Sequence, residues 1–560
     1  MNIDRRNFLR GGALAGGAAM LAAVGCTPTT QGDGKDGGSA SNLPEGVTDA
    51  FVEDSMIEVD EITDFAKEET YDIVVIGAGT AGVPAILTAL EEGATVACLQ
   101  REDSAQANGN GSSGIILEES NPLGMKQYIQ AWRKSGGYRM QGDLLQLFMD
   151  HSGETAMWIL TRSDEEGFPS YNVSATANKY EGDKGICTAV LKSYGPKPDN
   201  HGTLMRTLAQ RAEKEGAVFY YGTPCVQLQK DDSGRVVAAI GKNSDGYVKL
   251  IANKAVIIAA GDYQNNENMV KALSPDVARF GRKQSGRTGD GILMAALAGG
   301  RICPVNHAKT MHDMDAQPML LTRKPFMALD ESGKRFMNED IPMESWDLTL
   351  RERSLDVEDP GRFVRIFDND YQAKYELPPS MGVKTLENYI PGFKEDPENV
   401  YPDLTDTYRA DTLDELAEQL DIPADALKKS VEDWNKMCET GEDLEFGLSS
   451  ELMKPIDTPP YWGTRQWIRC SAINSGIGVN GNCQVVDENS EPIPGLYSVG
   501  SGAGSVSGGL EWNLAQGGLC CGIYMTMGRY AVIHALTGKM EPKNPMQYEE
   551  CKHYWEKKGK

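Results

Sequence analysis

Several features on which metal and haem proteins depend are scarce or missing in this chain of 560 residues. It has only six histidines, and its 11 cysteines form neither a CxxC pair nor a CxxCH motif. Zinc sites, cysteine-ligated iron–sulfur clusters and covalently attached haem rely on such spacings. We therefore expect neither a metal nor a haem on this chain, and we expect most of its cysteines to be buried apolar residues.

Basic residues are also fewer than acidic residues in this chain. Lys and Arg number 55 against 81 Asp and Glu, which gives a formal net charge of −26. An acidic surface repels nucleic acid and anionic lipid, so neither is an expected partner. Such a surface suits an exported protein or one that meets a basic redox partner.

A long apolar run is missing from the N-terminus, where a Gly/Ala/Leu stretch follows Arg5-Arg6. The stretch is too short and glycine-rich to span a membrane, and twin arginines before it indicate a twin-arginine export signal over residues 1–26. Ala23-Val24-Gly25-Cys26 resembles a lipoprotein cleavage box, which predicts a lipid anchor on Cys26 as the sole attachment to the membrane. The alternative is cleavage at another point near Cys26. The expected location is the cell envelope or periplasm, with the lipid-anchored form at the outer face of the membrane.

The Gly/Ser/Thr-rich sequence after the signal predicts a flexible tether over residues 27–66. About 490 residues then remain, enough for two or three domains.

The strongest pattern is a strand, a glycine turn, a helix and a second strand between Tyr71 and Arg101. This βαβ unit is typical of dinucleotide binding. Gly77 permits the tight turn, Gly79 lets backbone N–H groups approach a pyrophosphate, and Gly82 lets the helix pack closely with its N-terminus facing the anion. Gln100 stands where such units usually have an acidic residue for the ribose hydroxyls, and an amide can still bond to them.

Further elements follow along the chain. Residues 108–114 predict a small-residue loop, and helical sequence runs from there to about Glu166. We expect helices opening at His201 and at 288–291, strands at 216–221, 236–240 and 255–260, and an amphipathic helical stretch over 413–439.

The order of these motifs resembles the fumarate reductase and succinate dehydrogenase flavoprotein superfamily, which also contains urocanate reductases and ketosteroid dehydrogenases. The resemblance covers about 68–540 and includes, besides the glycine turn, the following motifs: Ala259-Ala260-Gly261-Asp262-Tyr263 with Asn265, Thr288-Gly289-Asp290-Gly291, Gly333-Lys334-Arg335-Phe336-Met337-Asn338-Glu339, Gly495-Leu496-Tyr497-Ser498-Val499-Gly500, Gly517-Gly518 and Gly528-Arg529. It implies an α/β fold in which a Rossmann-like FAD-binding domain, over 68–300 and 466–545, is split by an inserted α+β capping domain over 301–465. Arg335 is expected to organise that cap.

The resemblance places FAD contacts at a set of mostly small residues. They are Gly77, Gly79, Thr80, Ala81, Gly82, Gln100, Arg101, Asn108, Gly109, Ser113, Gly114, Val226, Gly261, Asp290, Gly500, Ser501, Gly517 and Gly518. Members that bind FAD covalently use a histidine near the loop after the second strand, and residues 101–120 contain none, so we expect non-covalent FAD. Ser501 replaces a glutamate that usually bonds the ribityl chain.

The residues that bind fumarate in this superfamily are missing. The proton-donating arginine, a carboxylate-binding histidine and a carboxylate-binding arginine correspond to Met343, to the neighbourhood of Ala472 and to the neighbourhood of Ala515. A buried dianion without cations is costly. The expected substrate is therefore a less anionic unsaturated organic molecule.

Four residues near those positions are candidate proton donors or polar anchors, namely His312, Arg323, Glu344 and Glu511. Each has a plainer explanation as a structural or solvated residue. Tyr263, Trp346, Tyr461 and Trp512 could stack on a substrate or belong to the core.

The leading hypothesis is an exported FAD-dependent reductase of an activated C=C, an enone or enoate. Gly500–Gly504 is not followed by a fresh βαβ unit, so no nicotinamide site is expected, and a separate cytochrome or quinol-linked protein must supply electrons. One alternative is a dehydrogenase of a ketosteroid-like substrate, although the late tyrosine expected of that group falls near Leu514. Another is a flavin electron carrier.

Overall fold

The computed structural model describes residues 43–555 with internal gaps. The gaps are 108, 110, 173–177, 180–184, 196–200, 305–306, 313–323, 342–345, 352–359, 392–405 and 508–517. Residues 1–42, with the predicted signal and Cys26, lie outside the described part. Within it, no helix combines the length and the apolar character needed to cross a membrane.

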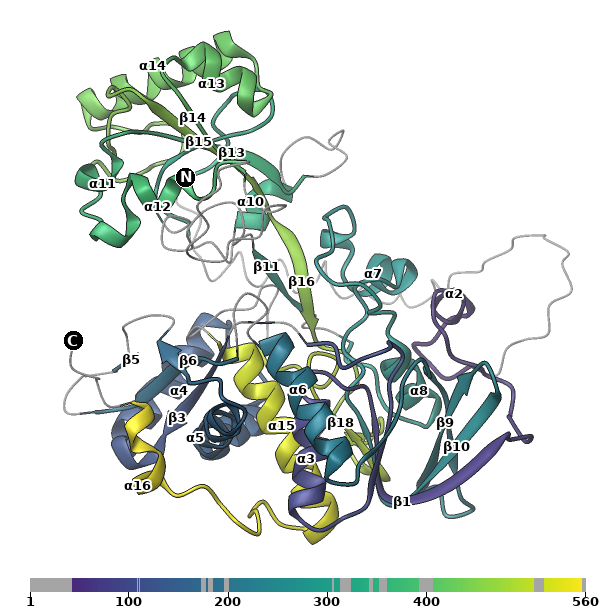
Figure 1. Cartoon of the computed structure of the whole chain (residues 1–560). Helices are drawn as coiled ribbons and strands as arrows, with labels where there is room; N and C mark the ends of the chain where they lie inside the picture. Colours follow the sequence, from purple (N-terminus) through teal and green to yellow (C-terminus); the bar gives the residue numbers. More distant parts are fainter. Residues whose placement is uncertain are drawn as a thin grey trace, which may run out of the picture. The chain divides into compact units, whose positions relative to one another are not determined.

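The largest sheet of the described residues has eight strands, several of which are labelled in Figure 1. Its main path runs β17 (Gln484–Val486), β18 (Pro492–Ser498), β10 (Gly246–Ile258), β1 (Lys67–Ile76), β2 (Val96–Leu99) and β7 (Val218–Tyr220), and β8 (Cys225–Lys230) and β9 (Val236–Asn243) continue it from β10. The pairs β18/β10, β10/β1, β1/β2 and β2/β7 are parallel. The Val/Ile run that ends β1 is buried, as expected for a parallel strand covered on both faces.

Four helices pack beside this sheet. α3 (Gly82–Glu91) lies against α6 (His201–Lys214) and α15 (Leu519–Thr537), and α15 also contacts α5 (Gly142–Glu165) (Figure 1). The Ala/Leu composition of α3 suits this position, because the helix is buried on almost every side.

The loop predicted over 108–114 is wrong for its second half. Gly111–Ile116 forms β3, which pairs antiparallel with β6 (Thr188–Ser193) and packs on α5. Its small residues permit this packing, since a side chain at Gly111 or Gly114 would collide with the backbone of Lys192 or Ser152.

The tether predicted over 27–66 is also wrong for residues 43–66. This segment contains α2 (Asp49–Glu53), and its apolar residues Val47, Phe51, Ile57 and Ile62 are buried.

A second sheet is antiparallel and has its own apolar core. Its order is β12 (Met327–Leu329), β13 (Arg362–Asp368), β15 (Tyr461–Trp467) and β14 (Thr407–Ala410). The helical stretch predicted over 413–439 is two helices, α13 (Leu413–Leu420) and α14 (Ala424–Thr440), separated where Asp421 adopts a left-handed conformation before Pro423.

Two further strands, β11 (Ala308–His312) and β16 (Arg469–Asn474), pair antiparallel with each other. The remaining helices are α4 (Pro122–Ser135), α7 (Glu267–Leu273), α8 (Asp290–Leu297), α10 (Trp346–Arg351), α11 (Tyr371–Lys374), α12 (Val383–Glu387) and α16 (Tyr548–Cys551). Seven of the ten described cysteines are buried, as predicted.

Candidate cofactor site

Three glycine turns meet at one edge of the central sheet. β1, β10 and β18 are neighbouring parallel strands, so their carboxyl ends lie side by side. Gly77–Gly82, 259–261 and 500–504 follow these ends directly. In open parallel sheets this edge is where ligands bind.

The turns approach so closely that only glycine fits at several positions. Gly77 has a φ of 99°, and a Cβ atom there would lie 2.7 Å from the carbonyl oxygen of Ala259. A side chain at Gly82 would collide with the carbonyl of Gly77, and one at Gly502 with the carbonyl of Gly261. The three turns therefore pack backbone against backbone, without intervening side chains.

Gln100 is built into the first turn. Its Oε1 accepts a hydrogen bond from the Ala78 N–H at 2.9 Å, and its Nε2 donates to the Ser104 carbonyl at 2.9 Å. The side chain is buried. The amide thus ties the turn to the loop after β2, a role that the sequence did not reveal.

A buried histidine supports Thr80 from behind. His201 Nε2 lies 3.1 Å from Thr80 Oγ1, and its Nδ1 lies 2.9 Å from the Tyr194 hydroxyl. Burial lowers the pKa of His201 to about 3, so the imidazole is neutral at physiological pH. The sequence marked His201 only as a helix start.

A second part of the site lies between β3 and the start of α15. Gly518, with a φ of 71°, precedes the helix, and its carbonyl accepts from Ser113 N–H at 3.1 Å. The Ser113 hydroxyl is buried and bonds to no group within the described part of the chain. An unpartnered buried hydroxyl beside a helix N-terminus fits a polar group of a bound cofactor.

Residues 43–66 contact two of the predicted FAD-binding residues, Val226 and Asp290. The Val226 carbonyl accepts from Glu58 N–H at 2.9 Å, and Asp290 Oδ1 accepts from Met56 N–H at 3.1 Å. Burial raises the pKa of Asp290. Arg101 donates to the Thr288 hydroxyl at 3.3 Å and to the Gly286 carbonyl.

The other residues predicted to contact FAD fall into three groups: some lie near the glycine turns or the start of α15, one serves packing, and some are outside the described residues. Gly500 and Ser501 are buried at the end of β18, Gly261 lies against Arg287, and Gly109 lies against Cys521. Gly114 faces α5, so its missing side chain serves strand–helix packing. Outside the described residues lie Asn108, Gly517, Arg323, Glu344 and Glu511, together with Met343, Ala515, Leu514 and Trp512.

Of the candidate substrate contacts, His312 has no described side chain, whereas two of the aromatic residues are buried. His312 ends β11 opposite Arg469, and its side chain is outside the described part. Tyr263 and Trp346 are fully buried, which favours the core interpretation. Arg335 forms ion pairs with Glu339 at 2.6 Å and Asp443 at 3.0 Å beside the second sheet, a structural position.

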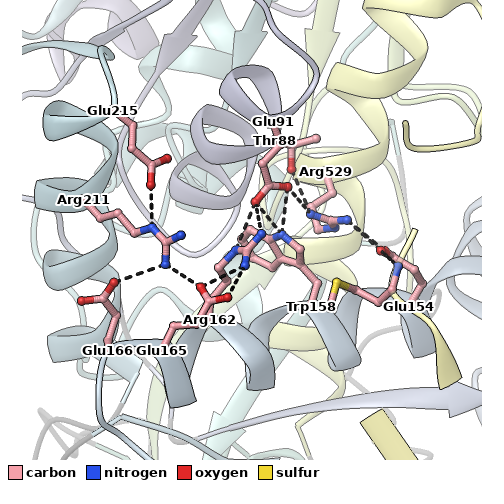
Figure 2. A network of polar contacts seen from close by, with 11 residues as sticks. Thr88, Glu91, Glu154, Trp158, Arg162, Glu165, Glu166, Arg211, Glu215 and Arg529 are labelled. Carbon is pink, nitrogen blue, oxygen red and sulfur yellow. Dashed lines mark hydrogen bonds and ion pairs between the residues drawn. The ribbon is translucent and has the colours of Figure 1, made fainter. Parts of the chain in front are cut away.

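A polar network behind the site joins the helices that carry it (Figure 2). Arg529 on α15 donates to Thr88 at 3.1 Å on α3 and to Glu154 at 2.9 Å on α5. Its guanidinium stacks 4.4 Å from the Trp158 ring, whose N–H donates to Glu91 at 3.0 Å. Arg162 also binds Glu91, and through Glu165 the network reaches Arg211 on α6. The Gly528-Arg529 motif thus fixes α3, whose N-terminus faces the glycine turns.

Taken together, the three turns, the helix start at Gly82 and the hydroxyl of Ser113 define a dinucleotide-binding site of the flavoprotein kind. Residues 72–513 match the FAD binding domain family, and the chain belongs to that family. FAD is its cofactor, and the protein is an FAD-dependent oxidoreductase.

Two reductases are among the proteins to which the chain is similar. The chain is 25% identical to the vinyl phenol reductase of Lactiplantibacillus plantarum (strain ATCC BAA-793 / NCIMB 8826 / WCFS1), over 84% of this chain and 97% of that protein. It is 26% identical to the digoxin reductase of Eggerthella lenta (strain ATCC 25559 / DSM 2243), over 90% and 92%. The solved structure of the open conformation of a flavocytochrome c3 fumarate reductase matches with a TM-score of 0.66 at 20% identity, over 87% of this chain and 79% of that chain. This likeness shows a mixed α/β FAD-binding fold.

Proposed function

We propose that this protein is an exported reductase that transfers a hydride from FAD to an activated C=C of an organic acceptor other than fumarate. FAD supplies the hydride when bound. The Gly77–Gly82 turn and the N-terminus of α3 would hold its pyrophosphate, and the Ser113 hydroxyl at the start of α15 would offer it a polar contact. Two relatives at 25% and 26% identity are a vinyl phenol reductase and a digoxin reductase, which supports an alkene as the acceptor.

One observation carries the exclusion of fumarate. At Ala472, near where a carboxylate-binding histidine is expected, β16 presents a methyl group opposite Thr310 of β11. A methyl group cannot compensate a carboxylate that has left water. The acceptor is thus less anionic than a C4-dicarboxylate, for example an enone or a vinylarene.

Three finer assignments accompany this proposal. The region of β12–β15, α13 and α14 is the cap that encloses the acceptor over a flavin domain split into two segments. Arg5-Arg6 and the Cys26 box support twin-arginine export with a lipid at Cys26, and electrons come from a separate cytochrome or quinol-linked protein, because the sequence offers no nicotinamide site. Replacing Cys26 by Ala and following the protein between membrane and soluble fractions tests the anchor.

The test of the function is anaerobic turnover. FAD-loaded protein is reduced with a viologen dye and offered fumarate, urocanate, cinnamate, 4-vinylphenol, digoxin and an enone steroid in parallel. We expect oxidation by one of the weakly charged alkenes, with the saturated product identified by mass. Rapid oxidation by fumarate would overturn the exclusion. Failure of every alkene, with reduction of the flavin by a saturated ketosteroid, would favour the dehydrogenase.

A further inference from the structure

One face of α15 carries a polar cluster that neither the FAD contacts nor the predicted catalytic residues include. The Tyr524 hydroxyl donates to Asn474 Oδ1 on β16, and Asn474 Nδ2 donates to the Thr310 hydroxyl on β11 at 2.8 Å. Cys520, one helical turn before Tyr524, shares hydrogen bonds with Thr310 and Tyr524. The helix and the strand pair thus hold the phenol in one orientation.

The Tyr524 ring keeps accessible surface in a crowded part of the molecule. Its helix neighbours Ile523 and Met525 are fully buried, whereas Tyr524, Cys520 and Ala472 are half-buried. Burial nevertheless raises the pKa of Tyr524 well above its usual value near 10, and Asp262 nearby adds to this. The phenol therefore stays protonated, on a residue that keeps some accessible surface.

The direction of the Tyr524 side chain brings its hydroxyl toward the proposed cofactor site. Side chains on a helix point toward its N-terminus, so the Tyr524 hydroxyl lies toward Gly518, where α15 meets Ser113. Its partner Asn474 and the half-exposed Ala472 belong to the same strand, β16. Met343 stands where the superfamily has its proton-donating arginine, so this chain requires another donor.

Building on the proposed reductase function, we propose that Tyr524, oriented by Asn474, is the catalytic residue that delivers the proton to the reduced alkene. Reduced FAD, when bound, would supply the hydride for one alkene carbon and with it the two electrons of the reduction. The Tyr524 hydroxyl turns its proton from Asn474 Oδ1 to the alkene, and the O–H bond breaks as a C–H bond forms at the other carbon. The tyrosinate then regains a proton from water, and the external electron donor reduces the flavin again. Asn474 is a positioning residue.

The test compares Tyr524→Phe with Tyr530→Phe in FAD-loaded protein. Tyr530 lies on the same helix, and its hydroxyl donates to Glu154 at 3.2 Å in the network behind the site, so its replacement removes one hydroxyl without touching the acceptor. A general acid contributes a factor of about 10² to 10⁴, so Y524F should lower kcat at least about 100-fold. KM for an alkene without a carbonyl should change little, because an alkene carbon, unlike a carbonyl oxygen, accepts no hydrogen bond from the hydroxyl before the reaction. Y530F should stay within about threefold of wild type. Visible spectra and unfolding midpoints verify that both variants bind FAD and fold.

A binding measurement separates this inference from the proposed function. 4-Hydroxyacetophenone, an uncharged carbonyl probe, is titrated against the visible flavin spectrum. Losing one hydrogen bond to its carbonyl should weaken binding about tenfold in Y524F and leave Y530F unchanged. If wild type turns over no alkene, the reductase proposal fails, and a Y524F-specific loss of binding still places Tyr524 at the acceptor.

Equal kcat values for the two variants would overturn the donor role, as would unchanged probe binding in Y524F. If Y524F does not fold, Asn474→Ala takes its place. That variant keeps the hydroxyl and loses its acceptor, and it should lower kcat about tenfold. Unchanged kcat in N474A would count against the proposal equally.

Discussion

His201 shows how a single residue outside the ligand site can set the pH range of the fold. Its neutral ring bridges Thr80 in the glycine turn and Tyr194. Its pKa falls from an ordinary 6.5 to about 3 in the folded protein because of burial. The folded state thus binds fewer protons than the unfolded state between these values. Stability is fully present above about pH 6.5 and declines as the pH falls toward 3, by up to about 1.4 kcal/mol per pH unit.

His201→Gln should remove this slope. In urea unfolding of the FAD-free protein, we expect the variant to be less stable than wild type at about pH 7.5, since one hydrogen bond of about 1 kcal/mol is disturbed. The difference should shrink or reverse at about pH 5. Protonation of His201 stabilises the unfolded state of wild type at that pH, whereas Gln takes up no proton in either state. Parallel curves for the two proteins would contradict the buried neutral state of His201.

Gln100 offers a second test at the scale of one residue. Acidic residues are usual at this position in dinucleotide-binding units, so Gln100→Glu could be expected to improve FAD binding. We predict the opposite for the apoprotein. A carboxylate cannot donate to the Ser104 carbonyl, and it places a negative charge against that oxygen, which should cost about 1–3 kcal/mol of unfolding free energy.

The control is Gln106→Glu, the same change at an exposed amide that also bonds to Ser104, with an expected effect within about 0.5 kcal/mol. Unfolding of both variants is measured without FAD, and FAD affinity is measured by quenching of flavin fluorescence. A stable Q100E with tighter FAD binding would show that the amide does not brace the turn.

At the scale of elements, Arg529 decides how firmly α15 holds α3 and α5. Its side chain is almost fully buried and pairs with Glu154, so Arg529→Met leaves a carboxylate without its cation. Breaking one partner of a buried pair costs about 3–5 kcal/mol. Arg211→Met is the matched control from the same network (Figure 2), because Arg211 is a quarter exposed and should cost about 1 kcal/mol or less.

Thermal unfolding and FAD affinity of both variants provide the measurement. Adding Glu154→Gln to R529M should recover part of the loss, because the unpaired charge is then gone. Equal losses in R529M and R211M would mean that the buried pair has no special weight in holding the helices.

The elements that the sequence predicts well are those whose pattern is local. The Val/Ile run before Gly77, the Ala/Leu helix after it and the strands near 218 and 236 occur where periodicity places them, and the strand expected over 255–260 is the end of the longer β10, Gly246–Ile258. β3 was missed because Gly111–Gly114 is poor in β-formers and becomes a strand only by pairing with β6. The ordered structure of residues 43–66 was missed because the predicted tether was extended from the preceding Gly/Ser/Thr-rich residues to residue 66. Their spaced apolar residues were the available signal.

The site follows the same rule. Glycine-rich turns can be recognised from sequence motifs, so the turns at 77–82, 259–261 and 500–504 were predictable. The bonds from Gln100 to Ala78 and from His201 to Thr80 join residues that no spacing rule connects, and they emerge only from the packed fold.

At the scale of the whole molecule, the described residues form one large apolar cluster, a separate one of moderate size and three small ones. The large cluster includes Ile73, Ile257 and Leu519 around the cofactor site. The separate cluster includes Met327, Leu416, Leu427 and Trp434 in the second sheet with its helices. Because buried apolar contacts carry most of the folding free energy, the two clusters should respond differently to FAD.

Removing FAD should therefore loosen only part of the chain. Ligand at about 100 times Kd stabilises the state that binds it by about 2.7 kcal/mol. We expect hydrogen exchange, read by mass spectrometry, to speed up in peptides covering β1, α3 and β10 when FAD is stripped. Peptides of α13 and α14 should exchange as before, since their core shares no residue with the glycine turns. Equal acceleration of both sets would mean that the two clusters open as one cooperative unit. In that case FAD would control the stability of the region that we propose as the cap as well as that of its own site.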